Sequence, residues 1–91
     1  MEISYDPAKN AENLANGRPS FDAVAGFDFQ TAFFWIDSRK EYGETRWSGL
    51  GFVGKRLHAL VFTETPTGIR VISFRKANKR EVRKYENASN P

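Results

Sequence analysis

Four segments between residues 27 and 75 have the composition of β-strands and are joined by short connections. They are rich in aromatic and β-branched residues, which pack well on a pleated surface. Gly54-Lys55 is typical of a two-residue hairpin turn, and short turns between neighbouring strands predict an antiparallel meander. Gly49 and Gly51 interrupt one segment, and we interpret them as positions where the strand bulges or another group approaches the backbone. The four predicted strands cover residues 27–37, 45–53, 56–64 and 69–75.

Helical patterns precede the predicted sheet. Asp6-Pro7 is a favourable helix start and Asn16-Gly17 a favourable helix end. A second short helix is expected over residues 21–26, with Ser20 as its N-cap. Residues 3–5 are either a short edge strand or a docked arm.

A third helix is expected near the C-terminus, including residues 76–85. Together these elements predict an α+β fold with two N-terminal helices, a four-stranded antiparallel meander and a C-terminal helix packed on the sheet. A chain of 91 residues has the usual size of one domain, so we expect a single domain over residues 1–91.

The composition excludes several classes of protein. The chain has no Cys, which excludes disulfides, thiolate nucleophiles and cysteine-ligated zinc. Its one His excludes sites that need two imidazoles, so we expect no metal and no cofactor. No apolar run approaches the ~20 residues that a membrane span needs, and the N-terminus lacks a signal-peptide pattern. These observations predict a cytoplasmic protein with no membrane partner.

Charge is distributed unevenly along the chain. Residues 1–45 carry eight acidic and four basic residues, whereas residues 46–91 carry three acidic and ten basic residues. A basic half on a small domain favours a polyanionic partner, nucleic acid first, over a merely solvated surface.

The last predicted helix concentrates this positive charge. On a helical wheel five cations occupy an arc of about 140° with no acidic residue among them. Like charges this close repel one another, so we interpret the arc as a phosphate-binding stripe rather than a solvated face. The five residues are Lys76, Lys79, Arg80, Arg83 and Lys84.

Glu81 lies on the opposite side of this helix, between Ala77 and Tyr85. A carboxylate on a docking face needs a partner, and an arginine of a neighbouring strand can supply one. Glu81 is therefore either a member of a structural ion pair or a carboxylate held for acid–base chemistry.

In the order and spacing of its motifs, the chain resembles the BrnT toxins of type II toxin–antitoxin systems, within the RelE-like ribonuclease superfamily. The resemblance rests on YDPAKNAENLANGRPSF (residues 5–21), GETRWSGLG (43–51) and IRVISFRKANKREVRKYE (69–86). Two positions depart from the family pattern. Ala15-Asn16 replaces a common Lys-His pair, and Thr65-Pro66 follows the third strand where an aromatic or basic residue is common.

The resemblance implies a metal-independent ribonuclease that cuts RNA and halts growth. It also implies a BrnA-type antitoxin with a ribbon-helix-helix part, which blocks the toxin and contacts operator DNA. The toxin itself would reach operator DNA only through that antitoxin. The positions that match the family pattern are Arg46, Arg70, Arg75, Lys76, Glu81 and Tyr85.

Metal-free cleavage of RNA needs a base for the attacking 2′-hydroxyl, an acid for the 5′-oxygen and cations for the phosphorane. We expect Arg46 and Arg75 to grip the phosphate, because a planar guanidinium binds phosphate bidentately. Glu81 is the candidate base, and Tyr85 the candidate proton donor or relay. The expected RNA-binding residues are Arg70, Lys76, Lys79, Arg80, Arg83 and Lys84.

Two other functions stay open at this stage. The same cations suit a non-catalytic nucleic-acid-binding domain, and the aromatic sheet suits a module that binds only a partner protein. Trp35 and Trp47 fit the core or an interface better than base stacking. His58, alone in an apolar strand, is interpreted as structural.

Overall fold

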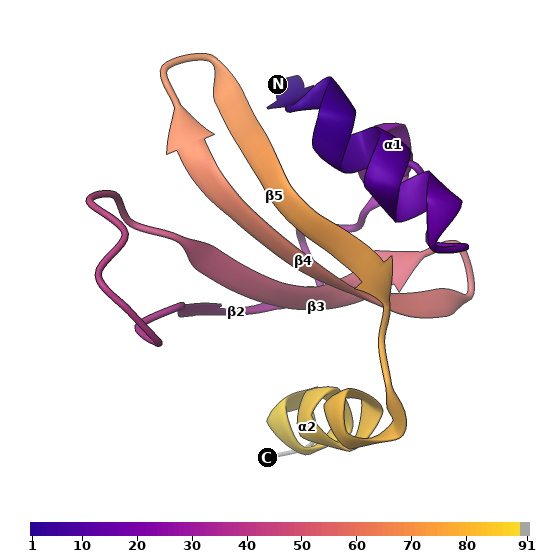
Figure 1. The fold of residues 1–91 in the computed structure, drawn as a ribbon. Coiled ribbons are helices and arrows are strands. Elements are labelled where there is room, and N and C mark those ends of the chain that lie inside the picture. The colour runs from indigo at the N-terminus through magenta and orange to yellow at the C-terminus, as the bar shows by residue number, and fades with distance from the viewer. Residues whose placement is uncertain (90–91) are drawn as a thin grey trace.

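The computed structural model describes residues 1–89, which form a five-stranded mixed sheet with helices on both faces (Figure 1). The strand order across the sheet is β1-β5-β4-β3-β2. β2 to β5 pair antiparallel, whereas β1 pairs with β5 in parallel. The strands are β1 (Glu2–Tyr5), β2 (Phe33–Ile36), β3 (Trp47–Val53), β4 (Arg56–Thr65) and β5 (Gly68–Lys76).

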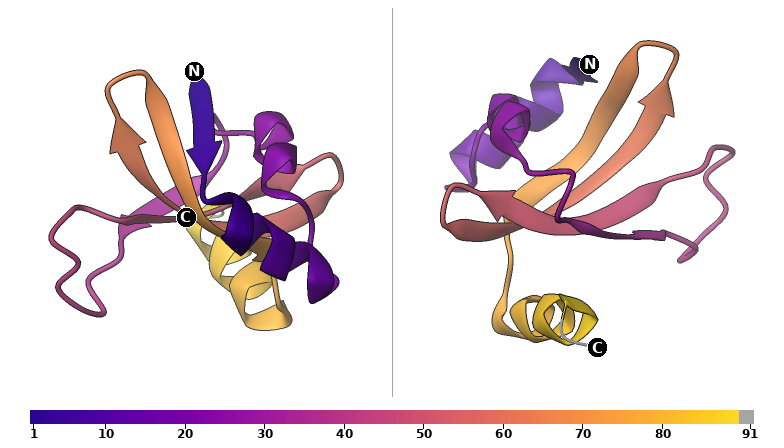
Figure 2. Two further views of the ribbon diagram at one scale, coloured as in Figure 1. Left: turned by 45° about the horizontal axis from the view of Figure 1, so that its top comes forward. Right: turned by 180° about the vertical axis from the view of Figure 1, so that it is seen from behind.

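Three short helices complete the described chain: α1 (Pro7–Ala15), the 3₁₀ helix η1 (Phe21–Gly26) and α2 (Lys79–Ser89). The predicted caps are confirmed, because the Asp6 side chain accepts a hydrogen bond from the Ala8 amide and Ser20 accepts one from Asp22. α1 and η1 lie on one side of the sheet and α2 on the other (Figure 2).

The expected fold, a RelE-like four-stranded antiparallel meander behind two N-terminal helices, is wrong. The sheet has a fifth strand, β1, and it is mixed because β1 runs parallel to β5. The second of the expected N-terminal helices is only a six-residue 3₁₀ helix. A four-residue strand is too short for its pattern to distinguish a paired strand from a docked arm. Gly68 opens the edge of β5 to β1, since a Cβ there would collide with the backbone of Glu2.

Two predicted boundaries are also wrong. The strand expected over residues 27–37 is paired continuously only at Phe33–Ile36. The side chain of Asp28 accepts hydrogen bonds from the Gln30 amide and the Thr31 hydroxyl, which holds a turn between Phe27 and β2. The last helix begins at Lys79, so Lys76 belongs to β5 and not to the helical stripe.

The sheet carries a different apolar cluster on each face. The larger cluster joins strand residues such as Leu60 and Phe74 to Phe21 and Val24 of η1, all at most 2% exposed. The smaller cluster, on the α2 face, is centred on Leu50, Leu57 and Ala77. Val82 and Tyr85 of α2 pack on it, so α2 covers only part of this face.

Gly49 and Gly51 of β3 lie under aromatic rings, which confirms the predicted close approach. A Cβ on Gly49 would lie 2.6 Å from the Phe34 ring, and one on Gly51 would lie 2.5 Å from the Phe27 ring. The two glycines therefore let aromatic side chains approach the backbone of β3 closely.

Candidate active site

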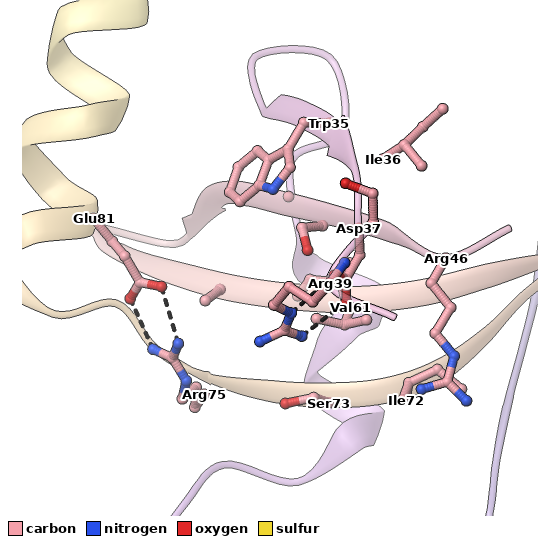
Figure 3. Close-up of a pocket in the computed structure, with 15 residues that line it drawn as sticks. Trp35, Ile36, Asp37, Arg39, Arg46, Val61, Ile72, Ser73, Arg75 and Glu81 are labelled. Carbon is pink, nitrogen blue, oxygen red and sulfur yellow. Dashed lines mark hydrogen bonds and ion pairs between the residues drawn. The ribbon is translucent and has the colours of Figure 1, made fainter. Parts of the chain in front are cut away.

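A cleft of about 380 Å³ lies on the α2 face of the sheet (Figure 3). β3, β4 and β5 form its floor, Glu81 of α2 stands at one side, and Trp35 of β2 at another. The segment between β2 and β3 completes the wall with Asp37, Arg39 and Arg46. The cleft is therefore built from segments that are far apart in the sequence.

Three arginines line this cleft, and each comes from a different part of the fold. Arg39 lies in the β2–β3 connection, Arg46 immediately precedes β3, and Arg75 lies near the end of β5. In the view of Figure 3, Arg39 lies between Arg75 and Arg46 along the cleft. Three guanidinium groups around one hollow can bind an anion with several oxygen atoms.

Arg75 forms a bidentate ion pair with Glu81. Its Nη1 and Nη2 donate to Oε1 and Oε2 of Glu81 at 2.7 and 2.9 Å. Hydrogen bonding to Glu81 raises the pKa of Arg75, while burial and the charge of Arg39 act in the opposite direction. The hydrogen bonds from Arg75 hold the pKa of Glu81 below its ordinary value, against the effect of burial.

Glu81 also takes part in the start of α2. Its Oε1 accepts from the Asn78 amide at 3.0 Å, and Asn78 Oδ1 accepts from the Glu81 amide at 2.8 Å. This reciprocal pair is a capping box, which satisfies backbone donors that the first helical turn leaves free. The cap and the ion pair together fix the carboxylate at the mouth of the cleft.

Asp37 and Arg39 form the second ion pair. Arg39 Nε and Nη2 each donate to Asp37 at 2.8 Å, and the Asp37 side chain is 2% exposed against 76% for Arg39. The hydrogen bonds from Arg39 lower the pKa of Asp37 to about 2. The Asp37 amide donates to the Arg46 carbonyl at 2.7 Å, which closes the β2–β3 connection. Asp37 thus holds both the β2–β3 connection and the Arg39 guanidinium in place.

Arg46 is held less completely than the other two arginines. Its guanidinium carbon lies 4.0 Å from the centre of the Tyr42 ring, a cation–π geometry. Its Nε lies 3.5 Å from Oε1 of Glu44, yet this buried Nε forms no hydrogen bond within residues 1–89. The Tyr42 ring and the Glu44 carboxylate therefore position this guanidinium without the bidentate pairing that holds Arg39 and Arg75.

Trp35 forms part of one wall of the site, and Lys84 lies against its ring. Trp35 lines the cleft, and Lys84 Nζ lies 3.7 Å from the centre of its indole ring. This cation–π contact brings a helical cation to the rim. On the floor, Ser48 of β3 and Ser73 of β5 contribute hydroxyl groups.

The match of the sequence to a protein-family model agrees with this basic cleft. A family model described as the ribonuclease toxin BrnT of a type II toxin–antitoxin system matches residues 5–81. The chain belongs to the BrnT toxin family. A ribonuclease toxin of a type II system acts on RNA and has an antitoxin as its partner. No curated protein and no solved structure gave a match.

The structure brings together three of the four residues that the sequence predicts to be catalytic. Arg46, Arg75 and Glu81 all line the cleft of this BrnT toxin. Tyr85 does not line it: its hydroxyl donates to the Thr31 carbonyl at 2.9 Å, and its ring packs edge-on against Phe52. Tyr85 is thus placed where it fastens α2 to the sheet and to the turn before β2.

The predicted RNA-binding residues are distributed over several surfaces. Lys84 contacts Trp35 at the edge of the cleft, and Lys79 and Arg83 line a separate hollow beside Arg56. Lys76 follows Arg75 on the strand, so the two side chains point to opposite faces. The remaining two are exposed and line none of the hollows described here: Arg70, which is paired with β1, and Arg80 on α2.

Sequence reasoning missed Asp37, Arg39 and the two floor serines. The signal for the first pair is the Asp-x-Arg spacing directly after a strand, which allows the carboxylate to bind its own chain two residues on. The signal for the capping box is Asn78-x-x-Glu81 before a helix. The serines carry no signal before the registers of β3 and β5 against β4 are known.

Within residues 1–89, no three or more His, Asp or Glu side chains gather in a way that could hold a metal ion. None of the helices in this range is long and apolar enough to cross a membrane. His58 is buried and stacked on Phe74 at 5.0 Å, on the core side of the sheet.

Proposed function

We propose that this BrnT toxin is a metal-independent endoribonuclease of the cytoplasm, which cuts RNA by attack of a 2′-hydroxyl on the adjacent phosphate and thereby inhibits growth. The observation that carries the proposal is the convergence of Arg39, Arg46 and Arg75 on the cleft that also holds Glu81. Guanidinium groups supply the positive charge that an RNA phosphate and its transition state require.

Arg46 and Arg75 bind the phosphate that is cut, with Arg39 between them. Arg46 lines the cleft and forms no bidentate pair with a carboxylate of the described chain, so its terminal nitrogens can bind phosphate oxygens. Arg75 already binds a planar carboxylate through two nitrogens, and the same pair of donors fits two phosphate oxygens.

Glu81 accepts the proton of the 2′-hydroxyl. In the free protein its hydrogen bonds to Arg75 keep its pKa low, which makes it a weak base. A phosphate that takes over one edge of the Arg75 guanidinium removes part of this effect, and the pKa of Glu81 rises towards its ordinary value. Substrate binding therefore strengthens the base at the point where it is needed.

The chemical step transfers the phosphate from the 5′-oxygen to the 2′-oxygen. The 2′-oxygen forms a bond to phosphorus, the bond to the 5′-oxygen breaks, and Glu81 takes the 2′-hydroxyl proton. Water in the open cleft gives a proton to the leaving 5′-oxygen, because the Tyr85 hydroxyl is engaged by Thr31 outside the cleft. The hydroxide that remains takes the proton from Glu81, which restores both the water and the carboxylate. The products are a 2′,3′-cyclic phosphate and a 5′-hydroxyl end.

The flanking RNA binds to cations around α2. Lys84 stands at the rim, and Lys79 and Arg83 with Arg56 line a hollow of about 560 Å³ on the other side of the helix. The exposed Arg70, Lys76 and Arg80 add to the positive field. Such contacts depend on salt and carry little sequence preference.

The antitoxin in this proposal is a BrnA-type protein with a ribbon-helix-helix part. It blocks the toxin and represses their shared operon, so the toxin meets operator DNA only through it. Purified complex that binds operator DNA, beside toxin alone that does not, is the expected result of a gel-shift assay.

The test of the enzyme is incubation of purified protein with end-labelled RNA in EDTA. Wild type is compared with Arg75→Ala, Glu81→Gln and the surface control Lys55→Ala. Glu81→Gln keeps the capping box, because glutamine serves at the same position, but it removes the negative charge. We expect cyclic-phosphate ends from wild type and Lys55→Ala, and at least a hundredfold slower cleavage from the two cleft variants.

A non-catalytic RNA-binding domain gives a different pattern in the same assay. Wild type then binds RNA without cutting it, and Glu81→Gln changes nothing. Cleavage that disappears in EDTA and returns with added Mg²⁺ contradicts the metal-independent mechanism.

A further inference from the structure

A second, smaller hollow of about 170 Å³ lies between α1 and β5. Lys9, Asn16 and Arg18 line it from the side of α1, together with the acidic Glu12. Ile72 and Ser73 line it from β5. Nothing in the proposed catalytic step uses this hollow.

The hollow adjoins the catalytic cleft across β5. Ile72 and Ser73 line both, although the cleft opens on the α2 face and the hollow lies beside α1. Two features of β5 make this possible. β1 pairs with β5 only as far as Val71, so the edge beyond it has no strand partner among the described residues. The register between β4 and β5 also shifts at this point, which makes Ile72 an extra residue in the strand.

The two cations of the hollow are not engaged by the fold. Lys9 and Arg18 are both exposed, and neither is in an ion pair within residues 1–89. Lys9 lies in the first turn of α1, where a positive charge opposes the helix dipole. The dipole of α1 therefore does not favour a lysine at this position.

We propose that Lys9 and Arg18 bind the backbone of the RNA strand after it leaves the cleft and passes over the open edge of β5. This subsite rests on the proposed function, because its ligand is the same RNA strand. It extends the cleft on the α1 side, away from the cations of α2. A single strand suits this path, because it bends more easily than a duplex and its phosphates are reached one by one.

The test measures binding separately from cleavage. The probes are fluorescent RNA oligonucleotides of three and twelve nucleotides, 2′-O-methylated throughout so that they cannot be cut. Anisotropy titrations over a range of salt give the slope of log K against log salt for wild type, Lys9→Ala, Arg18→Ala and the matched control Lys55→Ala. Lys55 is exposed in the β3–β4 turn and lines none of the three hollows.

With the twelve-nucleotide probe, we expect each subsite variant to lower the slope by about 0.7, the contribution of one phosphate contact to a single strand. Lys55→Ala keeps the wild-type slope. With the three-nucleotide probe, which fills only the cleft, no variant differs from wild type. Glu12→Gln tightens binding of the long probe, because it removes a negative charge from the hollow. Lys9→Ala does not lower the melting temperature, which excludes unfolding as the cause.

Three results overturn the proposal. Wild-type slopes for Lys9→Ala and Arg18→Ala with the long probe exclude the subsite and leave the catalytic cleft untouched. Equal losses with both probes indicate a general effect of charge rather than a distal contact. Absence of salt-dependent binding by wild type itself contradicts the proposed function, and with it the subsite.

Discussion

Neighbouring residues of the same strands lie on opposite faces of the central sheet and have different roles, one in the core and the other in the cleft. On β4 and β5, Leu60 and Phe74 point into the larger apolar cluster and are 0% exposed. Val61, Ser73 and Arg75, each one residue away, line the cleft on the other face. Alternation along a strand therefore places the main core and the candidate chemistry back to back.

The helices reinforce this difference. η1 seals the core face with Phe21 and Val24, and α1 adds the buried Asn13, whose amide donates to the Phe74 carbonyl at 2.8 Å. α2 covers the other face only around Leu50 and leaves the arginine cleft open. One face is thus closed for stability, while the other is half covered and accessible to a large polyanion.

The largest effect that separates the faces is expected at Phe74. Phe74→Ala removes a fully buried ring and should lower the free energy of unfolding by about 3–5 kcal/mol. Ser73→Ala, next to it on the cleft face, should change stability by less than about 0.5 kcal/mol. Urea denaturation monitored by tryptophan fluorescence measures both. Equal losses of unfolding free energy for the two variants contradict the conclusion that the core face stabilises the fold while the cleft face does not.

On the cleft face, the largest effect is expected on catalysis. Under the proposed mechanism, Arg46→Ala removes a donor to the phosphate and should slow cleavage by about 10²–10³-fold. Arg46→Lys keeps the charge but not the planar fork, so its rate should fall between wild type and Arg46→Ala. Single-turnover assays at saturating RNA give these rates. A rate for Arg46→Lys equal to wild type shows that charge alone suffices there.

Much of the local structure could be predicted from the sequence. Asp6-Pro7, Ser20 and Gly54-Lys55 act through neighbouring backbone atoms, so their caps and turn are visible without the fold. β1 could not be predicted with the same certainty, because its pairing with β5 joins residues 66 positions apart. The boundary of α2 depends on the Asn78–Glu81 capping box. The prediction instead begins the helix with the basic stripe, at Lys76, and so places the start too early.

The candidate site was predictable only in part. Arg46, Arg75 and Glu81 are found by residue type and motif, and the structure brings them into one cleft. Tyr85 lies one helical turn beyond Glu81, and the sequence predicts it beside Glu81 in the cleft. One turn along α2 is far enough that its hydroxyl binds the Thr31 carbonyl instead. Arg39 enters the cleft because Asp37 folds the β2–β3 connection back, which no periodic pattern indicates.

A smaller effect is expected where aromatic rings lie on β3. Gly51→Ala places a Cβ 2.5 Å from the Phe27 ring of the larger cluster, so the ring must move. Overpacking of this kind should cost about 1–3 kcal/mol. Gly26→Ala is the matched control, because its nearest neighbour, Val53, would lie at an ordinary 3.6 Å. Thermal melts of both variants measure the difference, and similar melting temperatures contradict close packing over Gly51.

The smallest effect at neutral pH concerns the carboxylate that holds the cleft wall. The pKa of Asp37 is lowered to about 2, because Arg39 binds its charged form. A carboxyl group with a lowered folded-state pKa stabilises the protein above its unfolded-state pKa, near 4. That contribution is lost as the pH falls from about 4 to about 2. We therefore expect the stability of wild type to decrease over this window, as measured by urea denaturation.

Asp37→Asn tests the contribution of this carboxylate to stability directly, because asparagine keeps the shape of the side chain but does not titrate. The variant should be less stable than wild type at pH 7, and the gap should narrow as the pH falls towards 2. Phe74→Ala gives the opposite behaviour, since its loss of stability comes from apolar burial and stays constant over the same range. A gap between wild type and Asp37→Asn that is independent of pH would mean that the Arg39 pair does not hold the cleft wall.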